Sequence, residues 1–478
     1  MTAKPFLSHY HRQYNSITSG NNALMRENLI KLYQLVSGRR FLKIYNELKR
    51  TEFLDRDSLL SLQRAKLYKL ISYAFQYVPY YRRTFDEVGF RPEDLDKDFN
   101  NFRKIPLLTK KDIIDHREEF FTTDIKVRKN LLPTSSSGTS GMPLSFWQDR
   151  NHWDHYKADY WRSLSYSGWQ LGDRTAYLWG IMDANKNQSL YARLRESMKK
   201  IADNSFKYSA LDLSDEKYAE LALRIRQERP VLLTGYASAL YAFAQYLRRK
   251  NLTDLKLRSV YSSAEMLYPH QREFINKTLN CRIFNRYVSR ELGIIAYECE
   301  MHNGMHVSME NCYAEVIGSD KTQDGGNAGE IILTDLNNFG FPFIRYCQGD
   351  MVQMKEQVCE CGRQGTVIES LKGRTADLFR RSDGGVVYGA FDVIPKKVSG
   401  IKQYQIIQRE VDLIIVRLVC DNKFDLKDKE TITRIIRKIM GEAALVRFEF
   451  HDKLSLSLSG KFRYCYSELA ETRQNEKE

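Results

Sequence analysis

The sequence predicts a mixed α/β protein with a large N-terminal part and a small C-terminal α/β unit. Between residues 175 and 290, short apolar segments alternate with segments of helical periodicity, an alternation that is typical of a mixed α/β domain. Strands and one helix recur after residue 400. A chain of 478 residues is long enough to bury a large core and to divide into at least two domains.

The first part of the chain is expected to be mainly helical. Apolar residues recur at helical spacing over 22–50 and again over 58–75, and Asp57 or Ser58 is the expected cap of the second helix. Pro79 should break that helix, because proline cannot continue it. We assign no chemistry to this part of the chain.

Strands and helices then follow one another along the chain. The expected strands share short runs of β-branched, aromatic and other apolar residues: 175–180, 231–235, 260–265, 283–287, 329–336, 404–408, 413–419 and 445–450. The expected helices share apolar residues at helical spacing: 190–201, 215–229, 236–247, 269–279 and 427–440.

Composition indicates a globular protein, with 42% hydrophobic and 28% charged residues. The sequence has neither a membrane-spanning apolar run nor the apolar core of a signal peptide, so we expect a cytoplasmic protein with reduced cysteines. The net charge of +14 fits polyanion binding. Basic residues are nevertheless spread along the chain without an RNA- or DNA-reading motif. We therefore favour an ordinary basic surface and no nucleic-acid partner.

Residues 134–143 read Thr-Ser-Ser-Ser-Gly-Thr-Ser-Gly-Met-Pro and are rich in hydroxyls and glycine. Gly138 and Gly141 permit positive φ, so successive backbone N–H groups can form an anion-binding concavity to which the hydroxyls add donors. This is not a Walker P-loop, because no Gly-Lys-Ser/Thr closes it. A flexible Ser/Gly linker has the same composition, so the segment alone supports both interpretations equally.

An aromatic cluster follows directly. It contains all five tryptophans, Trp147, Trp153, Trp161, Trp169 and Trp179, and the nearby tyrosines Tyr156, Tyr160 and Tyr166. Aromatic residues can line an acyl pocket or stack on a base. A cluster of this kind is more often domain core, and we favour core.

Cys299, His306, Cys359 and Cys361 could form a tetrahedral Cys₃His site. Thiolates and an imidazole suit structural Zn²⁺, and a Cys-x-Cys hairpin can place two thiolates on one ion. The Cys-x₆-His spacing is not that of a standard zinc finger. The alternative is buried thiols with an unrelated histidine. We favour zinc, because it would tie a distal loop to the core.

Taken in order, the motifs resemble those of the adenylate-forming superfamily of acyl-CoA synthetases, adenylation domains and luciferases. The residues of these motifs are most similar to those of the phenylacetate–CoA ligase branch, which includes members encoded with capsule and surface-polysaccharide genes. The resemblance extends roughly from Leu59 to Lys461. It identifies the Ser/Gly segment as a phosphate loop, made of Ser136, Ser137, Gly138, Thr139, Ser140 and Gly141. The lysine that commonly precedes the proline is Met142 here.

The resemblance implies an adenine site. Ser263-Ala264-Glu265 is similar to the segment that contacts adenine, so Ala264 and Glu265 would bind there. Residues 287–291 are similar to a Tyr-Gly-x-Ser/Thr-Glu segment, in which the tyrosine stacks on adenine and the glutamate holds Mg²⁺. Tyr287 and Glu291 keep the spacing. Val288 replaces the glycine and narrows the space beside the base, and Arg290 could compete with the metal or pair with a phosphate.

Two later segments complete the resemblance. Residues 345–350 are similar to an Arg-Tyr-x-x-Gly-Asp segment whose aspartate, here Asp350, binds ribose. Residues 373–377 resemble the hinge Gly-Arg-x-x-Asp, with Arg374 reaching ribose or phosphate and Asp377 as the pivot. The hinge predicts a large multi-sheet adenylate-forming domain over 1–373 and a small mobile lid over 374–478. The Ser-Gly-Lys segment that ends at Lys461 resembles the one that carries the catalytic lysine, although the following arginine comes one residue early.

The resemblance therefore implies an ATP-dependent ligase that activates a carboxylic acid as an acyl-adenylate and passes the acyl group to coenzyme A, an amine or a carrier. Lys461 and Glu291 would be catalytic, with ATP and Mg²⁺ required and Zn²⁺ structural. An in-line attack on the α-phosphorus mainly needs positioning and neutralised charge. Met142, Val288 and Arg290 motivate an alternative, a catalytically degenerate member that acts as a binding or scaffold component.

Overall fold

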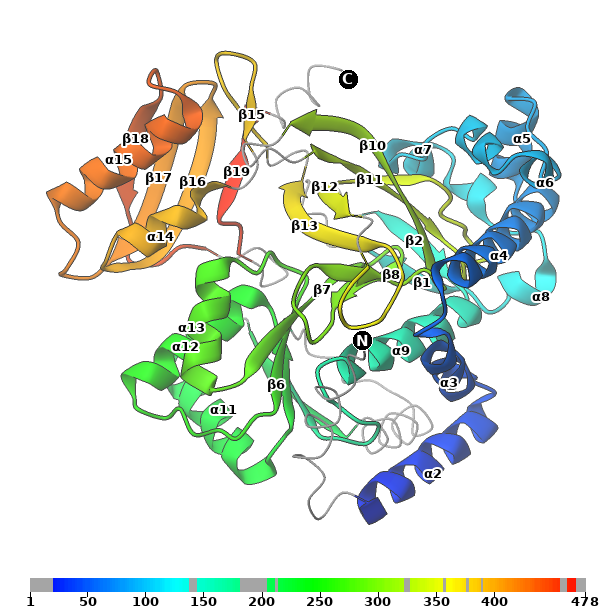
Figure 1. Cartoon of the computed structure of the whole chain (residues 1–478), viewed down its shortest axis with the longest axis horizontal. Coiled ribbons are helices and arrows are strands. Elements are labelled where there is room, and N and C mark those ends of the chain that lie inside the picture. The colour runs from blue at the N-terminus through cyan, green and yellow to red at the C-terminus, as the bar shows by residue number, and fades with distance from the viewer. Residues whose placement is uncertain are drawn as a thin grey trace, which may run out of the picture.

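The computed structural model describes residues 20–136, 144–180, 204–210, 214–321, 327–355, 358–374, 378–387, 390–455 and 462–469. A large region is built on an eleven-stranded sheet, and a small C-terminal region has its own four-stranded sheet (Figure 1). The predicted α/β fold class is confirmed. None of the described helices combines the length and apolar character needed to cross a membrane.

The large sheet has a parallel half and an antiparallel half. Its strands in sequence order are β3 (Thr175–Trp179), β4 (Ser205–Ser209), β5 (Leu232–Gly235), β6 (Ser259–Ser263), β7 (Arg282–Ser289), β8 (Gly293–Glu298), β9 (Met305–Val307), β10 (Cys312–Lys321), β11 (Asn327–Asp335), β12 (Tyr346–Lys355) and β13 (Val367–Arg374). They lie in the order β10-β11-β12-β13-β9-β8-β7-β6-β5-β3-β4. The pairs from β4 to β7 are parallel, and those from β7 to β10 are antiparallel.

Helices cover both faces of the parallel half. On one face, α11 (Asp215–Glu228), α12 (Ala237–Arg249) and α13 (Pro269–Leu279) pack on Leu178, Leu233 and Val260. On the other face, α3 (Phe41–Thr51) and α9 (Arg150–Ser165) pack on Leu232, Tyr261 and Phe284. Residues that alternate along each strand therefore face opposite layers, and this alternation decides which side chains can share a site.

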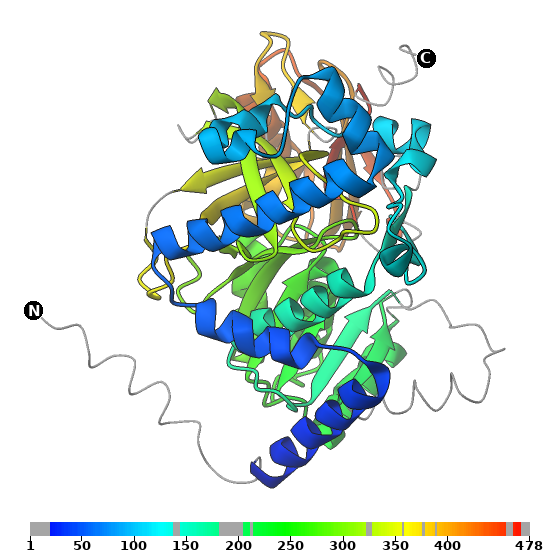
Figure 2. The same ribbon diagram turned by 90° about the vertical axis from the view of Figure 1, so that its right-hand side faces the viewer.

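The N-terminal segment is helical, as predicted, and the main helices are α2 (Gly20–Ser37), α3, α4 (Arg56–Tyr77), α5 (Pro79–Glu87) and α7 (Lys110–Asp115). Shorter turns lie between them: α6 (Asp94–Lys97), η1 (Phe99–Lys104), η2 (Arg117–Phe120) and α8 (Ile125–Arg128). Figure 2 shows α4 lying across the antiparallel half of the sheet, where Leu67 and Leu70 join the core of Ile331 and Leu333.

The predicted cap of α4 was wrong. Asp55 caps this helix, because its carboxylate accepts the Ser58 backbone N–H at 2.9 Å. Asp57 lies inside the first turn, where its charge still suits the positive end of the helix. Pro79 ends α4 as expected and occupies the first turn of α5.

The small region is an α/β unit with an independent core. Its sheet has the order β18-β17-β16-β19. The elements are β14 (Phe379–Arg380), β15 (Val386–Val387), η4 (Ala390–Val393), α14 (Ile394–Lys397), β16 (Ile401–Glu410), β17 (Leu413–Cys420), α15 (Leu426–Met440), β18 (Leu445–Phe450) and β19 (Cys465–Ser467). Ile432 and Ile436 of α15 pack on Ile414 and Val416 of β17. The strands and the helix predicted after residue 400 are confirmed.

Candidate functional site

A cluster of polar side chains joins β7 to β12 and β13. The Tyr287 hydroxyl donates to Oδ2 of Asp350 at 2.5 Å, and the Gln348 amide donates to the same oxygen at 2.6 Å. Gln348 also bonds the Tyr287 hydroxyl. Arg374 is opposite Asp350 in the β12–β13 register, with its Nε 3.5 Å from Oδ1. Tyr287, Asp350 and Arg374, predicted from remote segments, thus lie together, whereas Gln348 was not predicted.

Glu291 belongs to the same cluster. It lies in the turn between β7 and β8, and its side chain is buried. Burial raises the pKa of the Glu291 carboxyl, and Asp350 adds to the rise, whereas the positive charges of Arg374 and Lys110 oppose it. A carboxylate of this kind fits a cation well, because a bound cation would restore the ionised form.

The Ser/Gly segment starts beside this turn. Strands β1 (Leu132–Ser135) and β2 (Ser145–Gln148) form a two-stranded hairpin. Ser136 closes its end: the Ser136 N–H donates to the Leu144 carbonyl and the Ser136 hydroxyl accepts the Leu144 N–H, both at 2.9 Å. Ser136 therefore shapes the base of the loop. The other predicted loop residues, Ser137, Gly138, Thr139, Ser140 and Gly141, lie outside the described residues.

Two side chains fix the hairpin to the β7–β8 turn through three hydrogen bonds. The Gln148 amide of β2 donates to the carbonyls of Arg290 and Glu291, at 2.9 and 3.2 Å. Arg290 is exposed, and its Nε donates to the Ser135 carbonyl at 3.4 Å. Arg290 thus points to the base of the Ser/Gly loop, a position compatible with the phosphate contact considered from the sequence.

Glu265 connects the large region to the C-terminal segment. It follows Ala264, whose φ of 68° turns the chain after β6. One Glu265 oxygen accepts the Ser238 N–H at the start of α12 at 2.9 Å, and the other accepts the Phe462 N–H at 2.8 Å. Lys461 and Asp377 lie outside the described residues. The residue after Lys461 is therefore held beside the predicted adenine segment, a contact that has no signal in the sequence.

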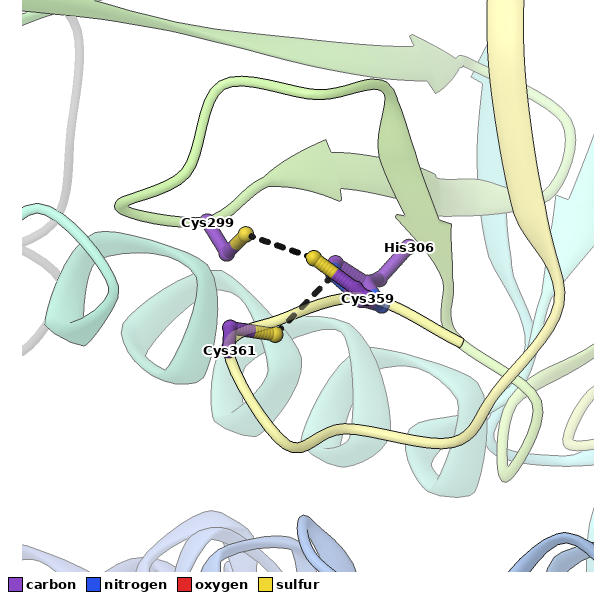
Figure 3. Close-up of side chains that lie close together, drawn as sticks. All are labelled: Cys299, His306, Cys359 and Cys361. Atoms are coloured by element: carbon purple, nitrogen blue, oxygen red, sulfur yellow. Dashed lines mark hydrogen bonds between the residues drawn. The ribbon is translucent and has the colours of Figure 1, made fainter. Parts of the chain in front are cut away.

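Cys299, His306, Cys359 and Cys361 converge in one buried cluster (Figure 3). Their four ligand atoms lie within 4.8 Å of one another, with Cys299 and Cys359 sulfurs 3.7 Å apart and Cys361 Sγ 3.4 Å from His306 Nε2. A tetrahedral Zn²⁺ with ordinary bond lengths separates two sulfurs by about 3.8 Å and sulfur from nitrogen by about 3.5 Å. The donor set and its spacing therefore fit zinc.

One of the three sulfurs favours the ionised form. Hydrogen bonds from Cys299 and His306 lower the pKa of the Cys361 thiol, and a metal binds the thiolate form. The hydrogen bond with Cys361 and burial raise the pKa of Cys299, and burial raises the pKa of Cys359. Cys299 directly follows β8, His306 is in β9, and the two other cysteines come from the segment before β13. A bound ion would thus link segments about sixty residues apart, as expected for a structural site.

The aromatic cluster agrees in part with the expected core. Trp161 and Trp169 are buried with α3 and α9. Trp147 packs on Phe121, with ring centroids 4.5 Å apart. Trp153 and Trp179 are half-buried, and Trp179 lies against Tyr236 at 4.4 Å.

Comparison with known proteins adds relatives in both parts of the chain. The family model of the CapK C-terminal domain matches residues 378–468. The phenylacetate-coenzyme A ligase of Thermus thermophilus is 24% identical over 375 residues, 75% of this chain and 80% of that protein. Protein CapK of Staphylococcus aureus is 22% identical over 459 residues, 91% of this chain and 96% of that protein.

Solved structures show the same fold. 2-Hydroxyisobutyryl-CoA ligase in the postadenylation state, in complex with an acyl-AMP, superposes with a TM-score of 0.70 at 18% identity, covering 90% of this chain and 94% of that chain. The same ligase in the thioesterification state gives a TM-score of 0.56, with the same coverage of both chains.

Proposed function

Because this chain is a relative of the phenylacetate–coenzyme A ligases and of CapK, with the adenylate-forming ligase fold, we propose that it is an ATP-dependent ligase. In this proposal it joins AMP to a carboxylic acid and then transfers the acyl group to an acceptor. The observation that carries the proposal is the convergence of Tyr287, Glu291, Asp350 and Arg374 beside the hairpin of the Ser/Gly loop.

The residues have distinct roles in the proposed reaction. Tyr287 would stack on adenine, with Ala264 and Glu265 at its edge, and Asp350 would accept the ribose hydroxyls. Arg374 would reach ribose or phosphate, and the loop from Ser136 to Gly141 would bind the β- and γ-phosphates. Mg²⁺ held by Glu291 would supply charge neutralisation to the triphosphate. Lys461 would place positive charge where the acid's carboxylate meets the α-phosphate.

Coenzyme A is the first acceptor to test, because the ligases that are similar to this chain are named as coenzyme A ligases. An amine or a carrier remains the second choice. The similarity to CapK supports a setting in surface-polysaccharide synthesis, and we propose a cytoplasmic location, where ATP is available. The Cys₃His cluster would hold a structural Zn²⁺, and the distances within it support that assignment.

The decisive measurement is ATP–pyrophosphate exchange over a panel of aryl, fatty, hydroxy, dicarboxylic and amino acids. We expect at least one acid to stimulate exchange and, with coenzyme A present, to release AMP. If none of the acids stimulates exchange and calorimetry detects no ATP binding, the alternative is favoured. That alternative is a catalytically degenerate binding protein, which Met142, Val288 and Arg290 motivate.

Replacing Glu291 by glutamine is expected to lower exchange by about 100-fold, because an amide binds Mg²⁺ poorly and leaves the triphosphate charge unbalanced. Without ligands, the same variant should be more stable at pH 8. The raised pKa of Glu291 means that the folded state favours the neutral carboxyl. The contribution of Glu291 to the free energy of unfolding is therefore fully present below pH 4.5 and is lost as pH rises through the folded pKa.

Thermal unfolding at pH 4 and pH 8 measures this effect, and the gain from Glu291→Gln should shrink at the lower pH. Glu369→Gln is the matched control, since Glu369 is an exposed carboxylate on the neighbouring β13. Unchanged exchange in Glu291→Gln would contradict the proposed role of Glu291 in the reaction.

A further inference from the structure

Arg286 is a buried cation on β7, one residue before Tyr287. Its side chain is 5% exposed. The guanidinium carbon lies 4.4 Å from the ring centre of Tyr160 and 5.0 Å from that of Tyr261. One terminal nitrogen donates to the Ser163 hydroxyl at 2.9 Å. Its Nε is buried and has no hydrogen-bond partner in the described part of the chain.

The other buried arginines of the described ranges are all paired with acids. Arg162 bonds Glu310 and Asp159, at 2.6 and 3.0 Å. Arg345 bonds Glu315 at 3.0 Å, and Arg363 bonds Glu52 and Glu300. Among the residues described, no carboxylate lies within ion-pair distance of Arg286. A buried charge without a counter-charge is strongly unfavourable, so this guanidinium is suited to an anion that comes from outside the chain.

Two hydroxyls on the same face of the sheet also lack partners. They are Thr234 Oγ1 and Ser263 Oγ, both buried and without a hydrogen bond in the described residues. Thr234 pairs in register with Tyr261, and Ser263 pairs with Arg286. Since Tyr261 faces α9, the alternation along β5, β6 and β7 puts Thr234, Ser263 and Arg286 on that face as well.

This face adjoins the candidate nucleotide site. Ser263 directly precedes the Ala264-Glu265 segment, and Arg286 directly precedes Tyr287. All lie towards the carboxyl ends of parallel strands, where open α/β sheets bind ligands. When the reacting carboxylate of a substrate meets the nucleotide, the rest of the acyl chain can therefore reach this polar face.

We infer that Arg286 binds a second anionic group of the acyl substrate, so that the acid is a dicarboxylic acid. The inference rests on the proposed adenylate-forming activity and names the substrate class of that same site. The guanidinium can donate two parallel hydrogen bonds to a carboxylate, and the Thr234 and Ser263 hydroxyls supply further donors. A monocarboxylic acid of the same length would leave the buried charge unpaired.

The test is ATP–pyrophosphate exchange with straight-chain dicarboxylic acids of four to eight carbons, their monoamides, and monocarboxylic acids of equal carbon number. We expect kcat/KM for the best dicarboxylic acid to exceed that of its monoamide and monocarboxylic counterparts by about 10- to 100-fold, the range of one charge-assisted interaction. Arg286→Met should remove this preference, and Arg286→Lys should keep part of it.

Arg282→Met is the control, since Arg282 is exposed at the opposite end of the same strand. Thermal unfolding of each variant checks the fold, and we expect no loss of Tm in Arg286→Met, because that change removes an unpaired buried charge. Equal activity with the three acid classes, or an unchanged preference in Arg286→Met, would overturn the role of Arg286 and leave the ligase proposal standing. If no acid stimulates exchange, both the role of Arg286 and the ligase proposal are overturned.

Discussion

Replacing Lys461 by alanine is expected to lower acyl-adenylate formation by about 1000-fold, the upper range for one group that stabilises developing charge. In the proposed reaction, this lysine neutralises the oxygens of the attacking carboxylate and the α-phosphate. ATP–pyrophosphate exchange with the best acid measures the loss. Transfer from a chemically prepared acyl-adenylate to coenzyme A should continue, because the lysine serves only the first step.

Lys453→Ala is the matched control, because Lys453 is an exposed lysine of the same C-terminal region. We expect the control to retain exchange and both variants to unfold at the same temperature as the unmodified protein. Normal exchange in Lys461→Ala would contradict the role given to Lys461. A loss of both half-reactions would point to damage of the small region instead.

Removal of the metal, or replacement of Cys361 by serine, is expected to lower Tm by about 10 °C or more, since structural Zn²⁺ adds its binding free energy to folding. The purified protein should contain one Zn²⁺ per chain by mass spectrometry of metals. Chelation should release it and expose the thiols of Cys299, Cys359 and Cys361 to a thiol reagent.

Cys420→Ser serves as the control, because Cys420 is a half-buried cysteine remote from the cluster in the β17 strand. Its metal content and Tm should match those of the unmodified protein. Metal-free protein with an unchanged melting temperature would show that the four side chains form a buried thiol cluster without an ion.

Local sequence signals predicted the elements well where several agreed. The bounds of α13 were predicted correctly, because Pro269 favours the first helical turn and Asn280 adopts the left-handed conformation that ends the helix. At α4, two acidic residues and a serine compete within four positions. The cap was assigned wrongly because only backbone geometry separates Asp55 from Asp57.

The candidate site was predictable in part for a similar reason. The order of short motifs indicated that Tyr287, Glu291, Asp350 and Arg374 act together, and these four do converge. Contacts that depend on the fold alone were missed. The bond between Glu265 and Phe462 joins residues 197 positions apart. Each of these residues lies in or beside a recognised motif, but neither motif indicates that the two are in contact.

Hydrogen bonds that join the small region to the large one at Glu265 and Gln271 indicate how much free energy would oppose the movement of the small region that the hinge resemblance implies. The described hydrogen bonds there run from Phe462 N–H to Glu265 and from Gln271 to the Tyr464 hydroxyl. The bond to the Glu265 carboxylate contributes about 1.5–3 kcal/mol and the neutral bond about 0.5–1.5 kcal/mol, so the sum of about 2–4.5 kcal/mol corresponds to a population ratio of about 30 to 2000. A ligand that prefers another arrangement by about 100-fold would therefore make the two arrangements similarly populated. In the proposed reaction, successive intermediates would shift this equilibrium without unfolding either region.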